Sequence, residues 1–425
     1  MPTELATTAA PGGAYRRFRG LSTAVQLLLW TQLMFNVGFY LVVPFLATFM
    51  TQSLGASGAM VGLVLGLRTF SQQGLFFLGG GLTDRFGVRP VLLTGIAIRV
   101  LGFLIAASAD STVHLMIGVI LIGFAAALFS PAAEAALATT GRDTERAGST
   151  TRAEVFAFDT FFSRTGALLG PVLGALLIDI GFDVTCWVAA GIFSLLFLAH
   201  LLLIPAVRTG TATPLLRGWS TVLRNRVFLI FALAYSTYLV SYNQQYLALP
   251  TELTRARGHQ EDLGWMFVYS SVLILLLQIP LGRRAQRMPR QRSLGAGFAL
   301  TAAGFLLLAV AAVFPPPPGL WSLAPAVTML TLMHLGQMLA VPVARDFVGI
   351  LAGERNLGAY FGFLNTFGGL AVLGSSLFLG HLLDAATTPQ PQAALPWFLL
   401  SLISASSALV LVALCRRVGA ATGRP

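Results

Sequence analysis

Charged residues are scarce in this chain, and lysine is missing altogether, because all 27 basic residues are arginines. Only 10% of the 425 residues are charged, whereas 56% are hydrophobic. Soluble globular chains carry about 25% charged residues, and a soluble core has no room for this much apolar surface. The composition therefore excludes an ordinary soluble protein and indicates that lipid surrounds most of the chain.

Cysteine is scarce as well, and the two cysteines, Cys186 and Cys415, fall in separate apolar segments near opposite membrane faces. This pattern argues against a disulfide and contains no metal-ligand spacing. The sequence also lacks a phosphate-binding loop and a nucleophile–histidine–acid set. We therefore expect no metal, no cofactor and no enzymatic activity, and any uphill transport has to use an ion gradient.

Long apolar runs account for most of the chain. A helix that crosses a bilayer needs about 20 apolar residues, and each of these runs is close to that length or above it. The runs cover residues 22–49, 57–82, 90–108, 113–139, 153–178, 185–205, 227–250, 262–282, 293–314, 320–344, 356–383 and 395–415. The sequence predicts an all-α integral membrane protein with twelve transmembrane helices, the first of which is retained and is not a cleaved signal peptide.

The arginines are concentrated in alternate connections between these runs, which hold 22 of the 27. The intervening connections hold only Arg255 and Arg257, together with acids such as Asp110 and Asp183. Because positive charge marks cytoplasmic loops, we expect both termini in the cytoplasm and the chain in the plasma membrane. The net charge of +11 is then a topology signal, and we expect no nucleic-acid partner.

The predicted helices fall into two sets of six. Residues 206–226 form the longest cytoplasmic connection, with one six-helix bundle predicted before it (1–205) and another after it (227–425). The two halves also show a weak sequence similarity, since tyrosines precede Pro44 in the first helix and Pro250 in the seventh. Two six-helix halves related as parallel repeats are typical of major facilitator transporters.

A short polar stretch, GGGLTDRFGVRP (79–90), separates the second and third runs. Asp84 lies at the C-terminal end of its helix, where the helix dipole disfavours a negative charge, so its partner has to come from elsewhere. Gly87 permits a turn conformation that other residues avoid. The residues that match the signature loop of the major facilitator superfamily are Gly80, Leu82, Asp84, Arg85, Gly87 and Arg89, whereas Val88 replaces a usual basic residue.

The fifth run strengthens this resemblance. Its residues Gly166, Gly170, Pro171 and Gly174 resemble the antiporter signature of the family's twelve-span drug–proton exporters. The stretch GLRTFSQQG (66–74), followed by GGGLTDRFG, also resembles multidrug exporters of that group. The glycine spacing alone is that of closely packed helices, which is a structural alternative compatible with the resemblance.

The resemblance implies a gating mechanism and a monomeric transporter. Asp84 would hold the two halves together on the cytoplasmic side by contacting the start of the eleventh helix near Gly358. Arg85 and Arg89 would join an acid such as Glu134, although they are equally compatible with a role as topology anchors.

Ionisable residues inside membrane helices are functional candidates by default because they are costly to insert. Asp159 in the fifth helix is a candidate proton carrier, and Glu154, one turn nearer the cytoplasm, competes with it. Arg164 belongs to the same proton-coupling set, because a nearby arginine lowers the pKa of a carboxyl and a change in their pairing would load or release a proton. Alternatively, Asp159 neutralises Arg164 or Arg99 and only holds helices together. Arg99 is more typical of such a structural role.

A substrate cavity is expected at the midplane between the halves. The polar and aromatic candidates to line it are Asn36, Tyr40, Arg68, Gln72, Tyr242, Asn243, Gln245 and Tyr246. The leading hypothesis is proton-coupled export of small amphipathic molecules. The alternatives are transport of one metabolite or sugar in either direction, or a receptor without transport.

Overall fold

Long helices form nearly all of the computed structural model, which describes residues 18–146, 152–203, 219–352 and 357–422. The first half of the chain comprises α2 (Thr23–Val42), η1 (Val43–Phe45), α3 (Leu46–Gln52), α4 (Gly58–Thr69), η2 (Phe70–Gly74), α5 (Phe76–Phe86), α6 (Val88–Ala107), α7 (Thr112–Arg146), α8 (Arg152–Ile178) and α9 (Phe182–Leu203). The second half comprises α10 (Trp219–Arg224), α11 (Arg226–Leu247), α12 (Leu249–Arg257), α13 (Leu263–Arg287), α14 (Arg290–Val313), η3 (Gly319–Leu323), α15 (Ala324–Ala352), α16 (Leu357–Asp384), η4 (Ala385–Thr387), η5 (Pro391–Ala394) and α17 (Leu395–Thr422).

The predicted all-α membrane fold is confirmed, because the described residues contain no strand and eleven helical segments are long and apolar enough to cross a membrane. The predicted seventh span is the exception to the apolarity criterion. It is present as the 22-residue helix α11, whose buried residues include Thr237, Ser241, Asn243 and Gln244. These polar side chains are buried against other helices and are not exposed to lipid, so a helix this polar is tolerated inside the membrane protein.

Large apolar side chains cover the outside of the molecule. Leu202, Leu233, Leu276 and Leu409 are each more than 60% exposed, and they belong to four different helices. In water such a surface would be an aggregation site, whereas hydrocarbon solvates it at no cost. The protein is therefore an integral membrane protein.

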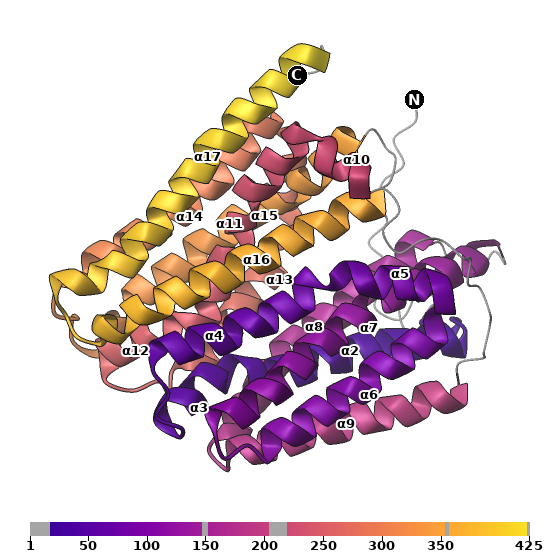
Figure 1. Cartoon of the computed structure of the whole chain (residues 1–425), viewed down its shortest axis with the longest axis horizontal. Coiled ribbons are helices and arrows are strands. Elements are labelled where there is room, and N and C mark those ends of the chain that lie inside the picture. Colours follow the sequence, from indigo (N-terminus) through magenta and orange to yellow (C-terminus); the bar gives the residue numbers. More distant parts are fainter. Residues whose placement is uncertain (1–17, 147–151, 204–218, 353–356, 423–425) are drawn as a thin grey trace.

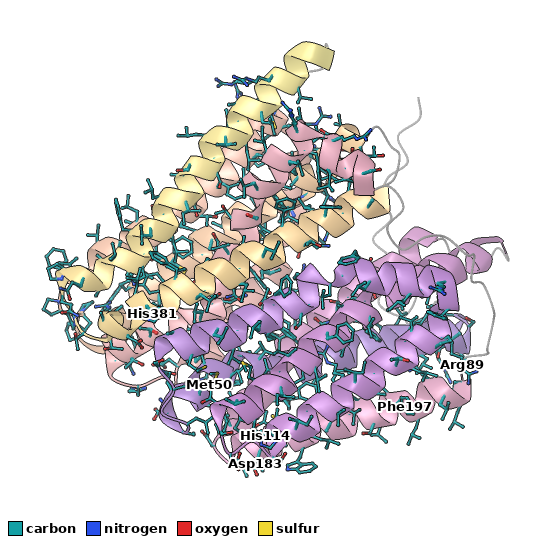
Figure 2. The ribbon with its side chains drawn as sticks, in the orientation of Figure 1. Met50, Arg89, His114, Asp183, Phe197 and His381 are labelled. Carbon is teal, nitrogen blue, oxygen red and sulfur yellow. The ribbon has the colours of Figure 1, made fainter. Side chains whose placement is uncertain are left out.

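The helices of each half of the chain lie next to one another, with α2–α9 on one side of the molecule and α11–α17 on the other (Figure 1). We call "arginine-rich end" the end where α5, α7, α13 and α15 finish and α6, α8, α14 and α16 begin. Figure 2 shows Arg89 at this end of the first half, with His114 and Asp183 at the opposite end. The division of the chain at residues 206–226 stays a prediction, and residues 206–218 lie outside the described residues.

The two halves are packed closely at the opposite end. The backbone N–H of Gly58, at the start of α4, donates to Asp384 Oδ1 at the end of α16 over 2.6 Å. Along the same pair of helices, a Cβ at Gly62 would collide with the carbonyl oxygen of Ser376. Nearer the arginine-rich end this tight packing is lost, since a Cβ at Gly80 or Gly358 would meet no described atom within 4 Å.

Two helical passes are interrupted where they approach the other half. Pro44 lies in the 3-10 turn η1, where its missing N–H removes one backbone hydrogen bond of the helix. Between α4 and α5 the chain widens into the π-helical turn η2, and Thr366 Oγ1 of α16 donates to the Gly74 carbonyl there. Irregular turns of this kind are frequent at functional sites.

Candidate functional site

A cavity of about 880 Å³ lies between the two halves. From the first half, α5, η2 and α7 contribute Gln72, Gln73, Phe76, Phe77, Gly80, Gly81, Ser130, Pro131 and Glu134. From the second half, α11, α15 and α16 contribute Tyr235, Ser236, Tyr238, Leu239, Val341, Arg345, Gly358, Ala359, Phe361, Gly362, Leu364, Asn365 and Gly368. Glu134 and Arg345 are exposed although they line this space, so the cavity opens to solvent at the arginine-rich end.

Opposite charges line the mouth of this cavity. Glu134 of α7 and Arg345 of α15 belong to different halves and lie within electrostatic range of each other. Neither forms an ion pair with a described residue. From the sequence, Arg345 belongs to the arginines that mark the cytoplasmic connections, because its position in the chain does not reveal which way its helix is rotated.

Asp159 lies close to Glu134, within electrostatic range, on α8. Its carboxylate is half-buried, and Oδ1 is buried without a hydrogen-bond partner. The alternative in which Asp159 neutralises Arg99 or Arg164 is wrong for this structure, because Asp159 forms no ion pair with any described residue. Arg164 lies further along α8, near Tyr40 and Tyr238, and forms no ion pair with a described residue. The side chain of Glu154 lies outside the described residues.

Six of the eight predicted cavity residues form a network that joins the halves beyond the inner end of the cavity. Arg68 Nη1 donates to Gln72 Oε1 over 3.3 Å and Nη2 donates to Thr69 Oγ1 over 3.0 Å. Thr69 Oγ1 then donates to Asn243 Oδ1 in the second half over 3.2 Å. The hydroxyl groups of Tyr40 and Tyr242 lie 3.0 Å apart, and those of Tyr242 and Tyr246 lie 3.4 Å apart.

Gln72 is among the residues that line this cavity, and the other seven are not, so their place in a substrate cavity stays a prediction. Arg68, Asn243, Gln245 and Tyr246 are buried, whereas Asn36, Tyr40 and Tyr242 are partly exposed. The other two candidates lie outside the network. Asn36 donates to Ser163 Oγ on α8 over 3.2 Å, and Gln245 is buried with Nε2 unpartnered.

A row of tyrosines on α11 connects the cavity to this network. Tyr235 and Tyr238 line the cavity, whereas Tyr242 and Tyr246 belong to the network. Their spacing of three or four residues places them on one face of the helix, and Tyr238 stacks on Tyr242 with ring centroids 6.4 Å apart. The sequence contained this signal, since the four tyrosines recur at helical spacing.

The signature loop has the expected backbone but different side-chain contacts. Gly87 has a φ of 85°, which confirms the turn conformation predicted for it. Arg89 donates to the Leu201 carbonyl over 2.8 Å, and the Arg85 guanidinium lies over the Phe86 ring. Neither arginine contacts Glu134, so that pairing is absent here, and the side chain of Asp84 lies outside the described residues.

The glycines of the fifth span pack α8 against α2. A Cβ at Gly170 would lie 2.6 Å from Tyr40 Cβ, and one at Gly174 would lie 2.7 Å from the Leu41 carbonyl oxygen. A Cβ at Gly166 would collide with the Leu33 carbonyl oxygen. Pro171 lies within the same helix. The close-packing role of this motif is therefore present, and its role in antiport stays a prediction.

Arg99 is buried among aromatic rings inside the first half. Its guanidinium carbon lies 3.9 Å from the Phe35 ring centroid and 4.8 Å from that of Phe193. Among the described residues, none offers a hydrogen-bond partner to its guanidinium nitrogens. Cation–π contact with these rings supports the structural role predicted for Arg99.

Comparisons with known proteins agree on one family. A sequence model of the Major Facilitator Superfamily matches residues 28–372. An uncharacterized MFS-type transporter of Mycobacterium tuberculosis is 36% identical over 387 residues, which cover 88% of this chain and 89% of that protein. Multidrug resistance protein MdtH of Aeromonas hydrophila is 31% identical over 380 residues, covering 88% of this chain and 91% of that protein. The crystal structure of a POT peptide transporter in complex with sulfate has a TM-score of 0.78 at 15% identity, covering 96% of this chain and 98% of that one.

Proposed function

Since the chain belongs to the major facilitator superfamily and is a membrane transporter, we propose that it exports small amphipathic molecules in exchange for protons. The similarity to proteins named for multidrug resistance supports export of drug-like compounds. In this proposal the cavity takes substrate from the cytoplasm through the arginine-rich end, and the chain acts as a monomer with both termini in the cytoplasm.

The observation that carries proton coupling is the unpaired carboxylate of Asp159. Oδ1 is buried without a partner, and an isolated carboxylate away from water costs free energy that a proton removes. Glu134 is exposed at the cavity wall and lies close to Asp159. It can therefore pass a proton between Asp159 and the solvent at the cavity mouth. A proton held at this pair would be exchanged when the cavity opens to the other side.

Proton release from purified protein in detergent tests this proposal directly. Lipophilic anions, lipophilic cations and neutral drugs are titrated into wild-type protein and into the Asp159→Asn variant. We expect binding to release protons from the wild type, and we expect the variant to bind drug with little release. Asp183→Asn is the matched control, because Asp183 is exposed at the opposite end of the molecule.

The other outcomes separate the alternatives. Unchanged release in Asp159→Asn would move the proton site to Glu134 or Glu154. An absence of binding across the whole panel would contradict the multidrug proposal, and transport of one specific metabolite or sugar would then be favoured.

A further inference from the structure

Arg68 is buried at the contact between the two halves, with only 4% of its surface exposed. It lies in the last turn of helix α4, two residues before the π-helical turn η2 begins at Phe70. Its guanidinium carbon lies 5.3 Å from the Phe39 ring centroid and 5.7 Å from that of Tyr246. Aromatic rings of both halves therefore enclose this positive charge.

Every polar partner of Arg68 among the described residues is neutral. Gln72 and Thr69 accept from its two terminal nitrogens, and Nε is buried without a partner. Removing a guanidinium from water is costly unless an anion pairs with it. No carboxylate among the described residues does so, and the buried guanidinium would therefore be stabilised by an anion.

A second arginine adds to the positive potential at this depth. Arg164 comes from α8 and lies within electrostatic range of Tyr40, whose hydroxyl meets that of Tyr242. Like Arg68, it forms no ion pair with a described residue. Tyrosine hydroxyls donate hydrogen bonds to anions, so two cations and a group of potential donors surround the same region.

The cavity reaches this region through one side chain. Gln72 lines the cavity and accepts from Arg68 Nη1, so the guanidinium lies one hydrogen bond behind the cavity wall. The hydrogen bond is 3.3 Å long and is made by an uncharged amide, which a charged acceptor replaces favourably. Rotation of Gln72 would expose the guanidinium to a molecule in the cavity.

We propose that Arg68, assisted by Arg164, binds the anionic group of the transported molecule, and that the substrates are amphiphilic organic anions bearing a carboxylate or a phosphate. This inference rests on the proposed transport function and narrows its substrate class. The acceptor oxygens replace Gln72 on the guanidinium, and the apolar part of the molecule lies against the tyrosine row of α11.

Arg99 is a second buried arginine, but its position does not suit it to bind a molecule in the cavity. It is also buried without a carboxylate partner, but its ring contacts, Phe35, Phe103 and Phe193, all come from the first half. Neither Arg99 nor any of these three rings is among the residues that line the cavity. Arg68 differs because its contacts come from both halves and because one of them, Gln72, lines the cavity.

Binding of probes that share one ring system and differ in charge tests the proposal. Naphthylacetate, naphthyl phosphate, neutral naphthylacetamide and naphthylethylammonium are titrated into the full-length protein in a neutral detergent without added lipid. We expect the two anions to bind at least tenfold more tightly than the amide and the ammonium. We expect Arg68→Gln to remove this preference and Arg68→Lys to keep part of it.

Two readouts keep the test independent of folding defects. Retained binding of naphthylacetamide by Arg68→Gln shows that the cavity is intact, and Arg283→Gln removes an exposed arginine and should keep the anion preference. Equal binding of all four probes, a preference for the ammonium, failure of both anions to bind, or an unchanged preference in Arg68→Gln would overturn the proposal.

Failure of this inference is distinguishable from failure of the proposed function. If lipophilic cations release protons through Asp159 and Arg68→Gln leaves that release unchanged, coupled export stands and the anion site falls. If naphthylacetate binds through Arg68 without proton release, the anion site stands and proton coupling falls.

Discussion

The hydroxyl groups of Tyr40 and Tyr242 lie 3.0 Å apart, although the two residues are 202 positions apart along the chain. Tyr40 belongs to α2 and Tyr242 to α11, so this hydrogen bond joins the two halves directly. It lies at the inner limit of the open cavity, where the halves separate on one side and remain in contact on the other. We expect this bond to break when the opposite end opens.

Removing one of these hydroxyls is expected to destabilise the conformation seen here. A hydrogen bond contributes about 1 kcal/mol net, or about a fivefold change in an equilibrium constant. Tyr40→Phe should shift the population by that factor toward the state open at the other end. Distances between spin labels at Phe86→Cys and Gly358→Cys measure the shift, since the native Cys186 and Cys415 are buried.

Tyr269→Phe is the matched control for this measurement. Its hydroxyl meets Thr331 Oγ1 at 2.6 Å within the second half, so the same chemical change should leave the label distances unaltered. An equal shift in both variants would show that the Tyr40 hydroxyl has no special role between the halves.

A side chain at Gly62 is expected to prevent closure of the opposite end. A Cβ there would collide with the Ser376 carbonyl of α16, and backbone cannot move aside as a flexible side chain can. Gly62→Leu should therefore favour the conformation in which α4 and α16 separate at that end. Labels at Thr51→Cys and Thr388→Cys report this separation.

Gly374→Leu provides the control, because a Cβ at Gly374 of α16 would meet no described atom within 4 Å. It adds the same bulk to the same helix pair without a collision. A conformation of Gly62→Leu indistinguishable from wild type would contradict the packing described here.

The fold was predictable from the sequence because burial in lipid leaves strong one-dimensional signals. Apolar runs predicted the helices, and the glycine spacing at Gly166, Gly170 and Gly174 predicted the close approach of α8 to a neighbour. Gly87 was predictable too, since only glycine readily adopts a positive φ.

The site was only partly predictable, because cavity walls depend on the rotation and separation of whole helices. The polarity of α11 correctly indicated a central helix, but it did not separate Tyr238, which lines the cavity, from Tyr242, which joins the halves. Arg345 has the sequence context of a loop arginine, and only the position of α15 places it opposite Glu134. No pattern in the sequence predicted the π-helical turn η2.

A buried ion pair at the opposite end makes stability depend on pH in a predictable direction. Glu252 and Arg255 are both buried and form hydrogen bonds of 2.7 and 2.8 Å. Burial raises the pKa of the Glu252 carboxyl, against the lowering effect of Arg255. A carboxyl whose pKa is raised by folding binds its proton more tightly in the folded state, so its stabilising contribution is lost as pH rises through the folded pKa.

Arg255→Met removes the compensating cation and should strengthen this dependence. The variant should melt at a lower temperature than wild type at pH 7, since breaking a buried pair costs about 3–5 kcal/mol. Its melting temperature should then recover as the pH is lowered and Glu252 is neutralised. A difference in melting temperature between variant and wild type that does not shrink on acidification would contradict this account.

Glu134 and Arg345 are expected to meet when the cavity closes. They line opposite walls, one on α7 and one on α15, and no described residue pairs with either. Closure of the arginine-rich end would bring the charges together in a space from which water is expelled, where opposite charges attract strongly and like charges repel. Glu134→Arg should therefore place two cations in the closing cavity, and Arg345→Glu should place two acids there. Each variant should reduce transport into proteoliposomes at least tenfold, whereas the exchanged double variant should regain a substantial part of the rate.

Because Glu134 is also close to Asp159, proton release is measured in parallel. A double variant that transports no better than the single ones would show that the two residues act separately.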